Sequence, residues 1–109
     1  EYGADAWDSR TNRENQAMQE EIVESLTQDI YDASSINASR NCAGGFVFEF
    51  NDEWWKYGSG SPWSHDTNAS WENGSYPDQK IQEEWWGLVD IDRQPRDAYY
   101  TYAAMEAPY

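Results

Sequence analysis

The 109 residues of this chain are enough for one small domain, and 21 acidic against 7 basic residues give a formal net charge of −14. This charge argues against nucleic acid and anionic membranes as partners, because both are negatively charged. No apolar run is long enough to cross a bilayer. The chain has 7 Trp, 8 Tyr and 3 Phe, whereas acidic disordered proteins are poor in aromatic residues. Aliphatic residues are few, so we expect a thin core that needs support from further chain or a partner.

The first predicted elements are the end of a strand with the loop after it, at residues 1–10, and a long helix. Thr11 and Glu14 have the spacing of a capping box, in which each side chain bonds the free backbone N–H of the other residue. The following helix, of about five turns, has an apolar stripe with a four-residue repeat, formed by Met18, Ile22, Leu26 and Ile30 with Val23 beside them. Residues 34–41 form a polar connection.

Residues 45–50 are predicted to form a strand, because they are aromatic and β-branched and follow a pair of glycines. Alternation along a strand places the three phenylalanines on one face, and Glu49 beside Val47 on the other. Burying a carboxylate is costly unless it is paired or hydrogen-bonded. Glu49 is therefore either a site residue or a salt-bridged structural glutamate.

Residues 51–84 are predicted to form a long loop rich in Gly, Ser, Asn, Asp and Trp. A loop of this length is usually functional or disordered, and its tryptophans argue against disorder. A short extended segment follows at 87–91, and Pro95 stands where a last helix, over 97–106, would begin. One strand for each helix along the chain predicts a parallel α/β sheet.

Two features bear on the compartment of the protein. Three sequons for N-glycosylation begin at Asn37, Asn68 and Asn73, all in predicted loops. They either mark a secreted glycoprotein or follow from the polar composition of loops. Cys42 is the only cysteine, so it is either a buried thiol, which we favour, or the partner of a cysteine outside this segment.

The tryptophans of the long loop are the candidates for ligand contact. Sugars present apolar C–H faces and hydroxyl rims, so their sites combine flat rings with carboxylates and amides. We favour sugar contact for Trp54 and Trp63, and anchoring of the loop for Trp85 and Trp86. His65 is either a polar contact in the loop or an ordinary surface histidine. The oxygen donors of the loop lack the order of a calcium loop, so no metal site is predicted.

Three segments, in this order and at this spacing, resemble glycoside hydrolase family 2 and related β-glucan-active enzymes of clan A. Residues 1–5 (E-Y-G-A-D) look like the nucleophile segment on strand seven, especially that of the β-glucuronidases. Residues 44–52 are similar to strand eight, with Phe48 where many members carry a sugar-stacking Trp. Residues 87–100 resemble the closing stretch, with its Asp-Arg-x-Pro-Arg-x-Ala-Tyr pattern.

The resemblance implies an α/β fold, namely the C-terminal portion of a (β/α)8 TIM barrel with about strands 7–8 and helices 7–8, incomplete on its own. The end of strand 7 and helix 7 would span about 1–36, strand 8 about 44–50, the Trp-rich loop about 51–86, and the closing segment and last helix about 87–107. The remainder of the barrel, from upstream chain or a partner chain, would then be a required partner.

The resemblance also implies a function, that of a segment of a secreted, extracellular retaining β-glycosidase acting on β-linked polysaccharide or oligosaccharide, with β-glucan favoured. Glu1 would be the nucleophile. Such enzymes need a second carboxylate about 5–5.5 Å away, and the family's acid/base glutamate has no counterpart here, so the chain alone is expected to be inactive. No cofactor or metal is implied. Carbohydrate contacts are expected from Tyr2, Phe48, Glu49, Asn51, Asp52, Trp54, Trp63 and His65.

Two alternatives to this enzyme stay open. One is a non-catalytic extracellular glycoprotein, or a carbohydrate-binding structural component, derived from a glycosidase barrel; the acidity and the three sequons favour it. The other is a small lectin-like module that folds alone, against which the thin aliphatic core argues.

Overall fold

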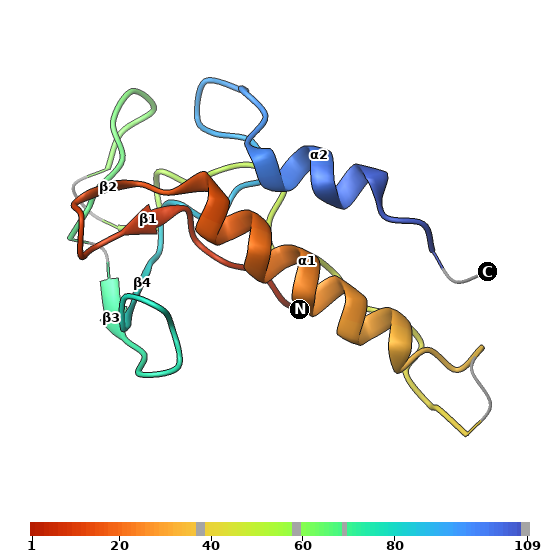
Figure 1. Ribbon diagram of the computed structural model, residues 1–109. Coiled ribbons are helices and arrows are strands. Elements are labelled where there is room, and N and C mark those ends of the chain that lie inside the picture. The colour runs from red at the N-terminus through yellow and green to blue at the C-terminus, as the bar shows by residue number, and fades with distance from the viewer. Residues whose placement is uncertain (37–38, 58–59, 69, 108–109) are drawn as a thin grey trace.

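The computed structural model describes residues 1–36, 39–57, 60–68 and 70–107 (Figure 1). Helices α1 and α2 lie side by side, and two small hairpins gather beyond the N-terminal end of α1. Both hairpins are antiparallel pairs, β1 with β2 and β3 with β4. The elements in chain order are β1 (Trp7–Asp8), β2 (Arg13–Glu14), α1 (Gln16–Asp32), β3 (Ser70–Glu72), β4 (Lys80–Gln82) and α2 (Asp97–Ala104).

The predicted amphipathic helix is confirmed as α1, but its N-cap is not the predicted one. Asn15 caps the helix, and its Oδ1 accepts a hydrogen bond of 3.2 Å from the backbone N–H of Met18. The capping box is wrong because Thr11 lies in the turn between β1 and β2, while Glu14 pairs with Trp7 in that hairpin. The hairpin thus uses the residues that the spacing had assigned to the helix start.

The second predicted helix is confirmed as α2, which Arg96 caps, with Pro95 one residue further out. Ala98 of α2 is fully buried and joins Ala4, Val23 and Leu88 in the aliphatic core. This core is small, as the composition predicts. Neither helix has both the length and the apolar content to cross a membrane, within the ranges that the structure describes.

The expectation of a (β/α)8 barrel portion is wrong. Both sheets among the described residues are antiparallel and two-stranded, and residues 44–50 form no strand. The backbone of this segment changes its partner within two residues, since Phe48 donates to Tyr2 O at 2.7 Å while Glu49 O accepts from Leu88 at 2.8 Å. Bonds divided in this way form isolated bridges and not a ladder. The predicted long loop is interrupted by β3 and β4.

Buried carboxylates fix the irregular segments in place of a large apolar core. Asp5, Asp52 and Glu84 are fully buried. A buried carboxylate is tolerated where hydrogen-bond donors surround it, and backbone N–H groups serve here. Gly87 donates to Asp52, Tyr57 and Asp66 donate to Glu84, and Gln82 donates to Asp5, so each carboxylate is bonded by a segment distant in the chain, at 2.7–3.1 Å. The neighbouring Trp7 also donates to Asp5, at 3.0 Å.

Candidate functional site

The candidate site is a cleft of about 460 Å³ between the N-terminal segment and the β3–β4 hairpin, which we call the aromatic cleft. Gly3 lies at its wall, and a Cβ at this position would stand 1.9 Å from Phe48 O. Only glycine therefore lets these two segments approach so closely. The lining residues are Glu1, Tyr2, Gly3, Leu26, Phe48, Lys56, Trp71, Asn73, Tyr76, Ile81, Glu83 and Trp86.

Aromatic rings from four segments form the walls of the aromatic cleft. Phe48 and Trp86 pack edge to face, with ring centroids 5.7 Å apart and planes at 70°. The Nζ of Lys56 lies 5.0 Å from the Phe48 ring centroid, and also 2.9 Å from Glu53 Oε2. Trp71, on β3, is 44% exposed. The cleft therefore offers flat apolar faces next to polar groups.

The two tyrosines of the cleft contribute their rings, because their hydroxyls are held by the protein. Thr27 Oγ1 donates to Val23 O at 2.7 Å, so the Tyr2 hydroxyl, 2.9 Å away, donates to Thr27. The Tyr76 hydroxyl accepts from the backbone N–H of Asp5 at 2.7 Å, and burial raises the pKa of this phenol. Tyr2 is thus directed at α1, and does not orient Glu1 through its hydroxyl.

Two carboxylates line the aromatic cleft, Glu1, which is exposed, and Glu83, which is half-buried. Glu49 follows the lining residue Phe48 but does not line the cleft itself. It is only 9% exposed, and its Oε1 has no hydrogen-bond partner among the described residues. Burial, and then the negative charge of Glu53, raise the pKa of Glu49 to about 8. The Glu49 carboxyl therefore holds its proton more tightly than an ordinary glutamate does.

Asp52 and His65 belong to a different, internal cluster. Arg96 donates to both oxygens of Asp52, at 2.8 and 2.7 Å, and its Nε donates to Glu14 at 2.6 Å. His65 Nε2 lies 2.5 Å from Asp52 Oδ2, and its ring stacks on Trp85 with centroids 4.0 Å apart. Asp52 and Arg96 are almost completely buried. These polar groups bind the long loop to the start of α2, and their bonding capacity is used by the protein.

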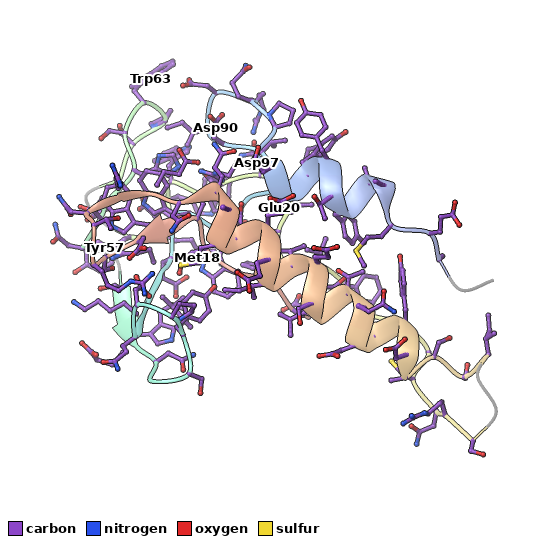
Figure 2. The ribbon with its side chains drawn as sticks, in the orientation of Figure 1. Met18, Glu20, Tyr57, Trp63, Asp90 and Asp97 are labelled. Atoms are coloured by element: carbon purple, nitrogen blue, oxygen red, sulfur yellow. The ribbon has the colours of Figure 1, made fainter. Side chains whose placement is uncertain are left out.

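The other predicted contacts also lie outside the aromatic cleft. Asn51 donates to Asp52 O at 2.7 Å and accepts from Arg93. Trp54 is half-buried, with its ring edge to face on Trp55 at 5.8 Å. Trp63 is 86% exposed at the outer edge of the molecule (Figure 2). The cleft thus unites Glu1, Tyr2 and Phe48 of the predicted set.

The sequons have different positions. Asn68 is exposed, while Asn73 is half-buried and lines the aromatic cleft, where its Oδ1 accepts from the backbone N–H of Ser75 at 3.1 Å. Asn37 lies outside the described residues. Cys42, for which a buried thiol was favoured, is half-buried and forms no disulfide.

Of the residues that the hairpin brings to the cleft, sequence reasoning placed Trp71 and Glu83 in the Trp-rich loop that could form a sugar-binding rim and Asn73 in a sequon, but gave Tyr76 no role. It favoured Trp86 as an anchor of the loop. One signal for them exists, because the Asn73-Gly74 dipeptide is typical of a turn between strands. A hairpin around it predicts that its aromatic residues share a surface. Which surface they face depends on contacts with residues 1–3, some 70 positions away.

No family model, no curated protein sequence and no solved structure matches the chain. Within the described ranges, no three His, Cys, Asp or Glu side chains are grouped so that they could hold a metal ion.

Proposed function

We propose that the aromatic cleft binds carbohydrate, and that the chain is a segment of a secreted retaining β-glycosidase acting on β-linked glucan or related oligosaccharide, with Glu1 as the nucleophile. The observation that supports this is the union, in one cleft, of aromatic rings with Glu1, Glu83 and the Asn73 amide. Rings stack on the C–H faces of a pyranose, while carboxylates and amides bond its hydroxyls.

The size and order of the cleft fit this ligand. Small-molecule sites commonly enclose about 300–1,000 Å³, and the aromatic cleft encloses about 460 Å³. The Tyr2 and Tyr76 rings are fixed by hydrogen bonds to Thr27 and Asp5, so they lose little freedom when a ligand binds. Such preorganised rings discriminate by shape.

Glu1 lines the cleft and is exposed, which supports its proposed role as the nucleophile. In the proposed reaction its carboxylate forms a bond to the anomeric carbon as the bond to the leaving oxygen breaks, and a second carboxylic acid protonates that oxygen. Water then releases the sugar. The resemblance assigns the second acid to a residue that this chain does not contain, so turnover belongs to the intact parent protein.

A non-catalytic carbohydrate-binding glycoprotein is the second candidate. One observation favours it, since Glu49 and Asp52, which the sequence grouped with Glu1, are buried and do not line the cleft. In this reading the cleft binds sugar through the same rings, and Glu1 only accepts hydrogen bonds.

The test compares two tryptophan variants in calorimetric titrations with cello- and laminari-oligosaccharides. Trp71→Ala should weaken binding about tenfold or more, because it removes a stacking face. Trp63→Ala is the matched control, since Trp63 is exposed outside the cleft, and this variant should bind as tightly as the unsubstituted chain does. Absence of binding by the unsubstituted chain, or equal losses of affinity in both variants, would refute carbohydrate binding at this cleft.

The enzyme and the binding protein are separated by Glu1→Gln in the intact parent. Loss of hydrolysis with retained oligosaccharide affinity is the result expected for a nucleophile. A parent that binds but never hydrolyses supports the second candidate, and near-parental turnover in the variant contradicts the role of Glu1.

A further inference from the structure

We infer that the ligand of the aromatic cleft is a β-glycoside with an apolar aglycone, and that a groove along α1 binds this aglycone. The inference rests on the proposed function, because the sugar would occupy the aromatic cleft. The groove encloses about 500 Å³ and is defined by residues of one face of α1 and of the turn that joins β3 to β4. We call it the aliphatic groove.

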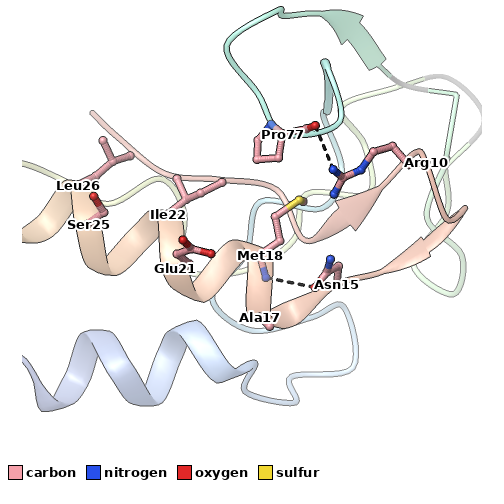
Figure 3. A pocket seen from close by; sticks show the side chains of 9 residues that line it. All are labelled: Arg10, Asn15, Ala17, Met18, Glu21, Ile22, Ser25, Leu26 and Pro77. Carbon is pink, nitrogen blue, oxygen red and sulfur yellow. Dashed lines mark hydrogen bonds between the residues drawn. The ribbon is translucent and has the colours of Figure 1, made fainter.

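The floor of the aliphatic groove is an apolar row on α1. Met18, Ile22 and Leu26 follow one another at four-residue spacing and turn toward the same side, opposite Pro77 and Arg10 (Figure 3). These are the residues of the predicted apolar stripe, of which Ile22 and Leu26 stay half-exposed. The fold thus leaves part of this stripe uncovered among the described residues.

The aliphatic groove continues the aromatic cleft. Leu26 lines both depressions, and the consecutive residues Tyr76 and Pro77 line the cleft and the groove respectively. A ligand whose sugar lies against Tyr76 can therefore extend past Leu26 into the groove without leaving the protein surface. This shared wall is what assigns the groove to a substituent of the same ligand.

The chemistry of the two depressions differs. Five aromatic residues line the cleft, whereas none of the residues that line the groove is aromatic. The apolar lining of the groove is Ala17, Met18, Ile22, Leu26 and Pro77, and Arg10, Asn15, Glu21 and Ser25 are its polar members. Sugar rings favour flat aromatic faces, while an alkyl chain gains by burial against any apolar surface. The groove therefore suits an alkyl or similar apolar aglycone better than a second sugar.

The polar groups at the end of the groove are already satisfied. Arg10 donates to both oxygens of Asp8, at 2.9 and 2.8 Å, and to Pro77 O at 3.2 Å, and Asn15 Nδ2 donates to Asp8 at 3.2 Å. The Asp8 carboxylate neutralises the Arg10 charge. Glu21 also lines the groove, but it is exposed, so its charge stays in contact with water. A neutral apolar group thus enters without leaving a buried charge unpaired.

The test is a calorimetric titration of the chain with methyl, butyl, hexyl and octyl β-D-glucosides, each below its micelle concentration. Each CH₂ group buried in the groove should tighten binding about two- to fourfold. Ser25→Lys places an ammonium beside Leu26 and should abolish the dependence on chain length while methyl glucoside binds as before. Ser35→Lys is the matched control, because this exposed serine lies outside the groove. Thermal unfolding checks that both variants fold.

Four outcomes overturn the inference. If the four alkyl glucosides bind with equal affinity while oligosaccharides still bind, the groove does not bind the aglycone, and the proposed function is unaffected. A chain-length dependence that Ser25→Lys does not change places the alkyl group elsewhere. Hexanol binding as tightly as hexyl glucoside means that the groove acts without the cleft. Failure of every glycoside and oligosaccharide to bind rejects the proposed function as well.

Discussion

At the scale of single residues, Asp52 is the side chain that joins the long loop to the start of α2 through buried hydrogen bonds. It is fully buried, it accepts two bonds from Arg96 and one from the backbone of Gly87, and His65 lies against it. A buried ion pair is weak evidence for net stabilisation, but removing one partner leaves the other charge buried and unpaired. The sequence put Asp52 and His65 at a sugar site; the structure places them in this cluster.

We predict that Asp52→Ala lowers the free energy of unfolding by about 3–5 kcal/mol, because buried Arg96 then loses both hydrogen bonds to Asp52 and keeps only Glu14 as a carboxylate partner. Urea denaturation followed by tryptophan fluorescence measures the change. Asp92→Ala is the control, since Asp92 is exposed and should change the free energy by less than about 0.5 kcal/mol. Similar losses in the two variants would contradict the account of the cluster.

At the scale of elements, the sequence predicts helix α1 correctly but places its N-cap at the wrong residue. The four-residue repeat predicts the helix because its period depends only on local geometry. Its first residue depends on what precedes it, and here the β1–β2 hairpin takes up Thr11 and Glu14 and leaves Asn15 as the cap. Asn15 also donates to Asp8, so it joins helix and hairpin.

We predict that Asn15→Ala costs about 1–2 kcal/mol of stability through loss of the cap. Thr11→Ala should cost less, because the Thr11 hydroxyl makes one bond, of 3.3 Å, to Asp8 O. Helical circular dichroism along a urea titration gives both values. A larger loss of stability for Thr11→Ala than for Asn15→Ala would favour the predicted capping box and contradict Asn15 as the cap.

The strands were predicted poorly because they depend on distant partners. Residues 44–50 have a strand-like composition, yet their backbone bonds are divided between Tyr2 and residues 86–89. The cleft shows the same division. Its half from residues 1–3 and 48 could be proposed from local motifs. Trp71 and Tyr76 join it only through the folding of the β3–β4 hairpin, and Trp86 only through its contacts with residues 48 and 49. One sequence alone does not reveal which distant segments hydrogen-bond to each other, so such contacts cannot be predicted from it.

At the scale of the whole molecule, the acidity predicted from composition becomes a dependence of stability on pH. Burial raises the pKa of Asp5 to about 8, and burial with the charge of Glu53 raises that of Glu49 to about 8. Both groups bind protons more tightly in the folded state. The stabilising effect of protonation is complete below their unfolded values, 3.8 and 4.5, and is lost as the pH rises to about 8.

We therefore predict that the free energy of unfolding is greatest near about pH 4–5. It should fall by roughly a few kcal/mol as the pH rises toward about 8. Below that maximum it falls again, because hydrogen bonds from Arg10 lower the pKa of Asp8 and protonation then removes their benefit. Thermal unfolding across this range is the measurement, and Glu49→Gln should flatten part of the alkaline slope. A melting temperature that rises steadily from pH 5 to pH 8 would be the opposite result.

The position of Asn73 has a practical consequence for anyone preparing the protein. Its side chain belongs both to a sequon and to the wall of the aromatic cleft. A glycan added to Asn73 by a eukaryotic expression host would stand at the wall of the cleft. Protein expressed in bacteria would lack this glycan. The two preparations would be different reagents in any binding assay, and Asn73→Gln would make them comparable at this position.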